Sequence, residues 1–343
     1  MSGQLHGSDS VPELSVIVPT YNAAASIRFC LESLIRQATP NTEIIVVDDA
    51  SSDGTCAIVS SYPVTLVSMD QNRGAGAARN RGVEISRGRI LLFVDADVEA
   101  APDVLSRALR DIKQPGVDAV IGSYDDAPFH RTTVSQFKNL AHHYFHQRAA
   151  GSATTFWGAC GVIRRERFVA AGGFDDEIRG IEDVDLGYRL TAAGAAIRLD
   201  PLLQVKHHKQ WTLASLVATD IRQRTLPWVL AWRKYGYLPQ GLNFGTGQRL
   251  AAMLAIVLLL SAVASPFVHA AAVPLVLCLS AAAWVNRGLY RLFWRKGGLR
   301  LLTVGFLLQQ FYYLYASAGL MFGLAASAKS ARHTALATTH RAA

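Results

Sequence analysis

Short, uninterrupted runs of apolar residues alternate with segments of helical spacing along the first 125 residues. The runs predict strands at Ser15–Pro19, Glu43–Val47, Val64–Val67, Ile90–Val94 and Val117–Ile121. The segments between them predict helices at Ala23–Gln37, from about Thr55, at Gly74–Ile85 and after Pro102. Strands without polar alternation are covered on both faces, and strand–helix alternation with short links is typical of a parallel sheet. The pattern therefore predicts an α/β domain whose sheet is mostly parallel.

The same pattern continues with weaker signals beyond residue 125. Residues 130–150 and Val184–Ala193 have helical spacing, and Leu199–Val205 predicts an edge strand. No internal repeat is evident. We therefore expect the α/β domain to extend over residues 13–210.

Two long stretches near the carboxyl end contain no Asp, Glu, Lys or Arg. They cover residues 250–286 and 301–328 and are 37 and 28 residues long. A membrane-spanning helix needs about 20 apolar residues. The first stretch is long enough for two spans with a tight turn near Pro266–Ala270, and the second is long enough for one. The sequence predicts a membrane region of about three transmembrane helices over residues 249–328.

The residues around these stretches predict their orientation. Residues 1–12 contain no apolar run, so we expect a disordered tail and no signal peptide. The basic connection Arg287–Arg300 is expected to face the cytoplasm by the positive-inside rule. We therefore expect a multi-pass protein of the inner cell membrane with a cytoplasmic α/β domain. A third span places the tail 329–343 outside, although that tail is itself basic.

The charge of the chain points to a membrane rather than to nucleic acid. The formal net charge is +8, and much of it lies beside the apolar stretches, where anionic lipid headgroups explain it better. Residues 211–248 interleave tryptophans and tyrosines with Arg and Lys, which indicates an interfacial helical segment. The four cysteines are far apart in the sequence and form no C-x-x-C pair, which is typical of reduced thiols without a disulfide or zinc site.

Polar loops follow three of the predicted strands. They are Pro19-Thr20-Tyr21-Asn22, the segment from Asp48-Asp49, and Asp95-Ala96-Asp97. In a parallel sheet these loops lie along one edge, where ligands of α/β sheets bind. Asp95 and Asp97 share a face and predict a site for a hard divalent cation that leaves positions free for a diphosphate, although a polar turn is the alternative. Asp48 or Asp49 is expected to accept hydrogen bonds from a base or ribose.

Five motifs in order carry a resemblance to a known family. SVIVPTYN, EIIVVDDASSDGT, NRGAGAARNRG and LLFVDADV are followed by GACGVIRRERFVAAGGFDDEIRGIEDVDLGYRL. Residues 13–210 thus resemble the family-two inverting glycosyltransferases of GT-A fold, the Rossmann-like fold of nucleotide-diphospho-sugar transferases. The resemblance implies a nucleoside-diphosphate sugar donor. It implies donor contacts from Pro19, Thr20, Tyr21, Asn22, Asp48, Asp49, Asn72, Gly74, Arg79 and Asp95.

The resemblance also implies the catalytic groups. The family's ED motif matches Glu182-Asp183, with Asp183 as the general base and Glu182 in a secondary role. Capping of the following helix is the structural alternative for these carboxylates. Asp95, Asp97 and His207 are expected to hold Mg²⁺ or Mn²⁺, with His208 as the alternative to His207.

Several other patterns in the sequence favour different functions less strongly. Gly74-Ala75-Gly76 opens a helix as in a dinucleotide-binding fingerprint, but Arg79 occupies the third glycine position. His142 and His146 have a spacing found in zinc sites but lack a third ligand nearby, so a polar helix face is preferred. Arg222-Gln223-Arg224 and Trp228 only partly match the Q-x-x-R-W motif of processive synthases, although Arg222 and Arg224 remain candidates for phosphate contacts.

The sequence thus predicts a membrane-anchored glycosyltransferase that moves one sugar, with inversion, to a lipid-linked or cell-envelope glycan acceptor. A processive polysaccharide synthase is the main alternative. A non-catalytic scaffold of the same fold is the other, and intact Asp95, Asp97 and Asp183 argue against it.

Overall fold

The computed structural model describes residues 11–225, 229, 234, 235 and 246–339, with side chains described except at 223, 224 and 324–339. Residues 1–10 of the predicted disordered tail, Trp228 and residues 340–343 therefore fall outside the described residues. The chain divides into two compact units. One contains residues 1–125 and 149–209, and the other contains residues 126–148 and 210–343.

The first unit is built on one sheet of nine strands within the described residues. Its order is β3-β2-β1-β4-β8-β6-β9-β5, with β7 paired to β9. The strands are β1 Leu14–Thr20, β2 Thr42–Asp48, β3 Thr65–Ser68, β4 Ile90–Val94, β5 Val98–Ala100, β6 Ala119–Tyr124, β7 Gly151–Ala153, β8 Cys160–Arg164 and β9 Ile197–His207. β1 to β4 run parallel, as does β6 with β9, while β8, β5 and β7 pair antiparallel to their neighbours. The predicted α/β sheet with mostly parallel strands is confirmed.

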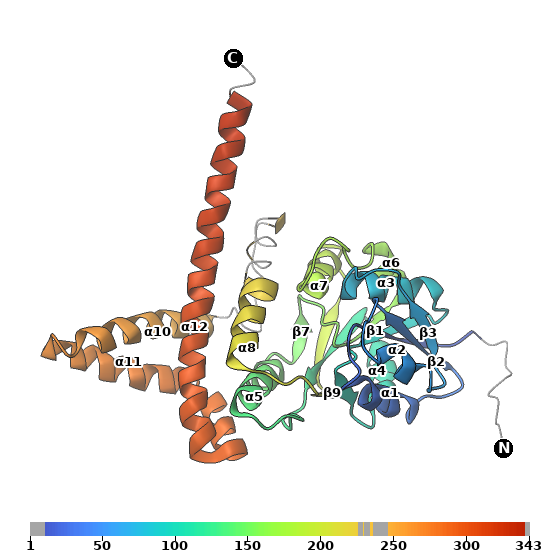
Figure 1. Ribbon diagram of the computed structural model, residues 1–343, viewed down its shortest axis with the longest axis horizontal. Coiled ribbons are helices and arrows are strands. Elements are labelled where there is room, and N and C mark those ends of the chain that lie inside the picture. The colour runs from blue at the N-terminus through green and yellow to red at the C-terminus, as the bar shows by residue number, and fades with distance from the viewer. Residues whose placement is uncertain (1–10, 226–228, 230–233, 236–245, 340–343) are drawn as a thin grey trace. The chain divides into compact units, whose positions relative to one another are not determined.

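Helices cover both faces of this sheet (Figure 1). They are α1 Ile27–Ile35, α2 Thr55–Val59, α3 Ala75–Ile85, α4 Val104–Ile112, α6 Arg165–Ala170 and α7 Glu182–Ala192. Alternate residues of a strand point to opposite faces. Val16 and Val18 accordingly join the core cluster of α1 and α4, whereas Ile17 lies against α3, where a side chain at Gly82 would collide with it. The continuous apolar runs in the sequence are explained by this coverage on both sides.

The sequence missed β5, β7, β8 and α6. β8 lies near the centre of the sheet, between β4 and β6, and is buried except at its last residue, Arg164. The apolar run from Cys160 to Ile163 could have indicated a strand. Its antiparallel place in the sheet could not be predicted, because its partners β4 and β6 are distant in the chain. α7 begins at Glu182, two residues before the predicted start.

The second unit consists of helices. They are α5 Thr133–Arg148, α8 Leu213–Asp220, the π-helical turn η1 Ile221–Thr225, α10 Thr246–Ala264, the 3₁₀ turn η2 His269–Ala271, α11 Ala272–Val285 and α12 Arg287–Thr339. α5 packs on α12 through Phe137 and Phe293, whose ring centroids are 5.8 Å apart. Lys138 of α5 is paired with the buried Asp220 of α8 at 2.7 Å. α5 therefore belongs with the carboxyl-terminal helices, although the predicted α/β domain included its residues.

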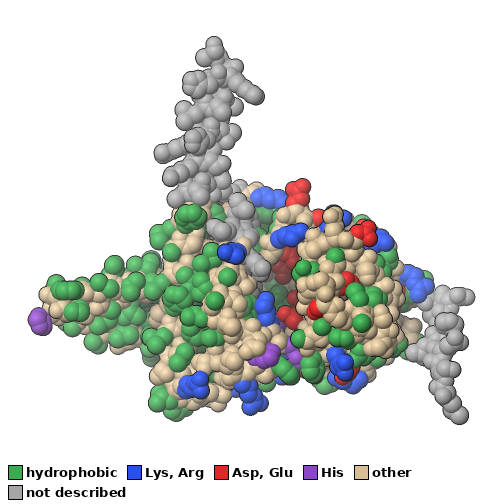
Figure 2. All heavy atoms as spheres, viewed as in Figure 1, with side chains coloured by type: hydrophobic (Ala, Val, Ile, Leu, Met, Phe, Trp, Pro, Cys, Tyr) green, Lys and Arg blue, Asp and Glu red, His purple; other side chains and the backbone are tan. Residues whose placement is uncertain are grey.

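The described residues contain one or two candidate membrane spans, and the predicted count of about three stays a prediction. One helix, Thr246–Ala264, is long and apolar enough to cross a membrane. A second candidate exists only if His269–Val285 and Arg287–Gly323, bent by 76°, are taken as one broken span. α11 has 14 residues and extends about 21 Å, less than the ~30 Å of a bilayer core. Gln309 and Gln310 interrupt the apolar character of α12. Apolar side chains cover the visible surface of α10 and α11 (Figure 2).

Candidate active site

The polar loops predicted to meet do so along the carboxyl edge of β2, β1 and β4. The register pairs Thr20 at the end of β1 with Asp48 at the end of β2. β4 runs parallel on the other side of β1 and leads directly into Asp95. Consecutive parallel strands therefore bring residues 19–22, 48–49 and 95–97 to one edge.

Asn22 joins the first two of these loops. Its backbone has a φ of 49°, and its Oδ1 accepts a hydrogen bond from the Ser52 amide at 2.8 Å. In return, Ser51 Oγ accepts a hydrogen bond from the Asn22 amide at 2.8 Å. Tyr21 beside it is half exposed. The PTYN loop is thus fixed to the DDASS loop, with one aromatic ring facing outward.

Asp48 and Thr20 retain hydrogen-bonding capacity at this edge. Asp48 Oδ2 accepts a hydrogen bond from the Ser51 amide at 3.0 Å. Within the described part of the chain, Asp48 Oδ1 and Thr20 Oγ1 are buried without a hydrogen-bond partner. Buried polar atoms are nearly always paired, so these two atoms favour a site for a polar ligand.

Asp49 uses both carboxylate oxygens to hold the loop before α3. They accept hydrogen bonds from the amides of Arg73 at 2.7 Å and Gly74 at 2.8 Å, and Asn72 Nδ2 donates to the Asp49 carbonyl at 3.3 Å. Gly74 has a φ of 97°, a conformation that favours glycine. Asp49 and Asn72 therefore position the entry to α3.

Arg79 of α3 is the central cation of the site. It is 4% exposed, and its Nη2 lies 2.6 Å from Asp95 Oδ1 while its Nη1 lies 3.0 Å from Glu182 Oε1. Its guanidinium also stacks over the Phe174 ring at 5.3 Å. The two carboxylates raise the pKa of Arg79 against the opposing effect of burial, so the group stays charged. The sequence allowed two roles for Arg79, a contact to the donor or a charge on the solvated face of a helix. Because Arg79 is buried, it is not a solvated surface charge.

Gly158 makes room for this guanidinium. A Cβ at residue 158 would lie 2.8 Å from Arg79 Cζ. The Gly158 amide also donates a hydrogen bond to Asp183 Oδ2 at 3.1 Å. Sequence reasoning did not single out Gly158, although its place in GACG, the start of one of the quoted motifs, was a usable signal.

Asp183 lies in the first turn of α7 and does not cap it. The N-cap residue is Ile181, without a side-chain cap hydrogen bond. Asp183 Oδ1 accepts from the Val184 amide at 2.8 Å. Burial, reinforced by the neighbouring Glu182 charge and opposed by Arg79, raises the pKa of Asp183 to about 6. The group is therefore ionised near neutral pH and basic enough to accept a proton.

Asp97 faces His207 at the end of β9. His207 Nε2 lies 3.5 Å from Asp97 Oδ2, and its ring stacks on Tyr124 with centroids 4.4 Å apart. His208 instead contacts Glu99 Oε2 at 3.1 Å and stacks on Phe29. The structure thus places His207, rather than His208, beside the second aspartate of the DAD loop.

The three predicted metal ligands have suitable chemistry but do not yet converge. Within the described residues, no three Asp, Glu, His or Cys side chains form a group that could hold a metal ion. Burial raises the pKa of Asp95, Arg79 opposes that effect, and the Asp97 charge adds to it. A cation would relieve the repulsion between these two carboxylates. Arg222 lies in η1 of the second unit, and the side chains of Gln223 and Arg224 fall outside the described residues.

Comparison with known proteins gives a family match and several relatives. The sequence model described as "Glycosyl transferase family 2" matches residues 15–169. The chain is 37% identical over 120 residues to the succinoglycan biosynthesis protein ExoO of Rhizobium meliloti, covering 34% of each protein. It is 32% identical over 190 residues to an uncharacterized glycosyltransferase of Haemophilus influenzae, covering 52% of this chain and 61% of that one. The aligned region thus spans about a third to three fifths of these relatives.

The fold also resembles that of a solved structure. The mannosyltransferase PcManGT from Pyrobaculum calidifontis, in complex with GDP-Man and Mn²⁺, superimposes with a TM-score of 0.57 at 22% identity. The superposition covers 91% of this chain and 88% of that one. The predicted GT-A fold class with a helical carboxyl-terminal region is confirmed.

Proposed function

We propose that this protein is a membrane-associated, inverting glycosyltransferase, because the sequence model of glycosyl transferase family 2 matches residues 15–169. The proposed reaction moves one sugar from a nucleoside-diphosphate sugar to a hydroxyl of a lipid-linked or cell-envelope glycan acceptor. Its site lies at the carboxyl edge of β1, β2 and β4. The proposed location is the inner cell membrane, with the α/β unit in the cytoplasm.

One observation carries the proposal most directly. Arg79 contacts Asp95, at the end of β4, and Glu182, which immediately precedes Asp183. The donor-side carboxylate and the base-side helix are therefore held by one buried guanidinium. A site for a two-substrate reaction needs this juxtaposition, because the attacking hydroxyl and the anomeric carbon must be brought to within about 3–3.5 Å.

Asp183 is the proposed general base. The acceptor oxygen forms a bond to the anomeric carbon, and the bond from that carbon to the diphosphate breaks with its electron pair leaving on the diphosphate. Asp183 takes the hydroxyl proton during this attack and releases it to solvent afterwards. The amides of Gly158 and Val184 hold both of its oxygens, so the carboxylate keeps a fixed orientation. Its pKa of about 6 leaves it ionised at pH 7.

Asp97, His207 and Asp95 are the proposed ligands of a divalent cation. Carboxylate oxygens and a neutral imidazole suit Mn²⁺ or Mg²⁺, and Asp97 and His207 are already neighbours. When bound, such an ion stabilises the charge of the departing nucleoside diphosphate. The PcManGT complex contains Mn²⁺ and GDP-Man, which supports a cation and a nucleotide-sugar donor here.

The donor nucleotide is proposed to lie over the loops after β1 and β2. Asp48 and Thr20 offer the unpaired polar atoms, while Pro19, Tyr21 and Asn22 form the neighbouring wall. Asp49, Asn72 and Gly74 support this site by fixing the turn into α3.

The names of two relatives support an envelope glycan as the product. One is the succinoglycan biosynthesis protein, and another is the putative teichuronic acid biosynthesis glycosyltransferase TuaG of Bacillus subtilis, 38% identical over 104 residues. The apolar helix α10 supports an acceptor presented at a membrane.

The proposal is tested with membranes containing the full chain, supplied with UDP-, GDP- and dTDP-sugars, lipid extract and Mn²⁺. We expect release of one particular nucleotide and a lipid-extractable product extended by a single sugar. A long polymer would instead identify the processive alternative. No nucleotide release from any donor would contradict the enzymatic function.

A further inference from the structure

The carboxyl-terminal helices have an unusual charge composition. Residues 221–343 contain thirteen Lys and Arg residues and no Asp or Glu. Part of this segment is strongly apolar, as α10 shows. A positive, acid-free region of this kind attracts anionic membrane lipids, but such attraction is diffuse unless the fold supplies a defined pocket.

The second unit contains such a pocket along α12. Gly298, with a φ of 61°, interrupts α12 so that residues on either side of it face a common cavity. This cavity, called here the α12 groove, has a volume of about 620 Å³. Its walls include Tyr290, Trp294, Phe306 and Leu307, and its rim includes Arg287 and Arg291. The volume lies within the range of ligand-binding pockets in proteins, which is about 300–1,000 Å³.

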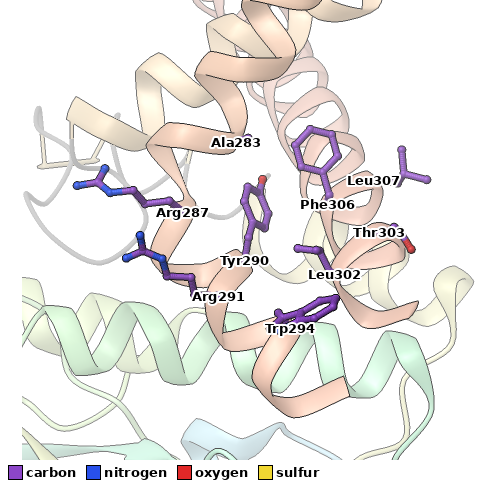
Figure 3. Close-up of a pocket in the computed structure, with 9 residues that line it drawn as sticks. All are labelled: Ala283, Arg287, Tyr290, Arg291, Trp294, Leu302, Thr303, Phe306 and Leu307. Atoms are coloured by element: carbon purple, nitrogen blue, oxygen red, sulfur yellow. The ribbon is translucent and has the colours of Figure 1, made fainter. Parts of the chain in front are cut away.

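Two arginines carry the positive charge at the rim of the groove. They lie four residues apart and project from the same side of the helix (Figure 3). Among the described residues, neither has a carboxylate within ion-pair distance, whereas nearby Lys296 is paired with Asp126 at 2.6 Å. Arg287 is partly ordered by stacking on Trp284, with its Cζ 4.4 Å from the ring centroid.

The apolar surroundings indicate that the ligand is a lipid rather than a soluble anion. Trp294 and Leu307 line the groove and are 55% and 65% exposed, and Trp284 beside the rim is 67% exposed. Tryptophans with exposed rings are typical of membrane–water interfaces. A soluble phosphate would leave this apolar wall uncovered, whereas an acyl chain would cover it.

We propose that the α12 groove binds a membrane phospholipid with an anionic headgroup. The phosphate lies between the guanidinium groups of Arg287 and Arg291, and one acyl chain packs along Tyr290, Phe306 and Leu307. Arginine suits this role because its planar fork can donate two parallel hydrogen bonds to phosphate oxygens. The proposal concerns the helical unit alone and holds whatever reaction the α/β unit catalyses.

The test uses the full chain in a neutral detergent, titrated with dioleoyl phosphatidylglycerol or dioleoyl phosphatidylcholine, with bound lipid counted by native mass spectrometry. We expect preferential retention of phosphatidylglycerol. The double variant Arg287→Gln/Arg291→Gln should need about thirtyfold more of it for half-saturation, by the usual contribution of two interfacial basic residues. The matched variant Arg295→Gln/Arg300→Gln removes the same charge from exposed positions outside the groove and should retain the lipid normally.

Equal weakening by both double variants would show diffuse electrostatic attraction and overturn the proposal. Equal retention of phosphatidylcholine, or displacement of the lipid by millimolar inorganic phosphate, would also overturn it. So would a dimer that only the Arg287/Arg291 variant disrupts, since the occupant would then be a second copy. Thr303→Trp, which fills the groove, should abolish retention, while Thr303→Val should not. If the tryptophan variant fails to fold, the arginine pairs still decide the question.

Discussion

Asp95 and Glu182 share one guanidinium, because Arg79 Nη2 lies 2.6 Å from Asp95 Oδ1 and Arg79 Nη1 lies 3.0 Å from Glu182 Oε1. This buried bridge connects the end of a parallel strand to the first turn of α7. The bridge positions both proposed halves of the chemistry, the cation-binding loop and the general base.

Replacing Arg79 should therefore damage stability and activity together. In Arg79→Lys, a single ammonium cannot bridge two carboxylates, and one buried carboxylate loses its partner at a cost of ~3 kcal/mol or more. Thermal unfolding should show this loss. Adding Glu182→Gln to Arg79→Lys should restore part of the lost stability, because the lysine ammonium then has to pair with only one carboxylate, that of Asp95. Arg81→Lys on the same helix, whose ion pair with Glu84 is exposed, should be nearly neutral.

Asp183→Asn should change the pH dependence of stability. The pKa of Asp183 rises from 3.8 to about 6 on folding, so the stabilising effect of its protonated form is complete below pH 4 and is lost as the pH rises through 6. Relative to the unmodified protein, Asp183→Asn should gain roughly 2–4 °C in melting temperature between pH 4.5 and pH 7.5. Asp70→Asn, on an exposed loop, serves as the control. If the melting temperatures of Asp183→Asn and the unmodified protein differ by the same amount at pH 4.5 and at pH 7.5, the raised pKa of Asp183 is contradicted.

The rate of sugar transfer should depend on the same ionisation. Because the base must be unprotonated, turnover should be level above pH 7 and fall tenfold per unit well below the Asp183 pKa of about 6. The measurement is turnover at saturating donor, acceptor and Mn²⁺ between pH 4.5 and 8. Full activity at pH 4.5 would exclude Asp183 as the base.

The two adjacent histidines should behave differently toward the cation. His207 faces Asp97 and His208 faces Glu99. His207→Ala should therefore raise the Mn²⁺ concentration for half-maximal activity by about 10–100-fold, as loss of a metal-site partner typically does. His208→Ala should leave this concentration unchanged, even if stability falls. The opposite result would assign the cation to His208.

Much of the α/β unit could be predicted because its strands carry local signals. β1, β2 and β4 are largely apolar runs, and these adjacent parallel strands end at one edge of the sheet, which brings the three polar loops together. β8 and β5 could not be placed in this way, since their antiparallel pairing is set by partners distant in the chain. The burial of Arg79 could not be predicted for the same reason. The sequence places Arg79 on a helix, but its buried position depends on ion pairs with Asp95 and Glu182, and Glu182 is distant in the chain.

The carboxyl-terminal helices show a different limit of sequence reasoning. Composition located the apolar residues but not where each helix begins and ends. The break between α10 and α11 leaves only 14 residues in α11, and the basic connection Arg287–Arg300 forms the helical start of α12. Within the described residues one helix, or two if the bent pair counts as one span, meets the length of a membrane span, so the number of spans stays a prediction.

The proposed mechanism depends above all on Asp183 as the base for a hydroxyl acceptor. The most direct test measures nucleotide release coupled to sugar transfer, at saturating donor, lipid acceptor and Mn²⁺ at pH 7.5, for the unmodified chain and for Asp183→Asn. We predict a loss of about 10²–10⁴-fold in turnover with the donor still bound, the usual range for removal of a general base. Turnover within a fewfold of the unmodified protein would contradict the assignment and indicate an acceptor, such as a phosphate, that needs no base.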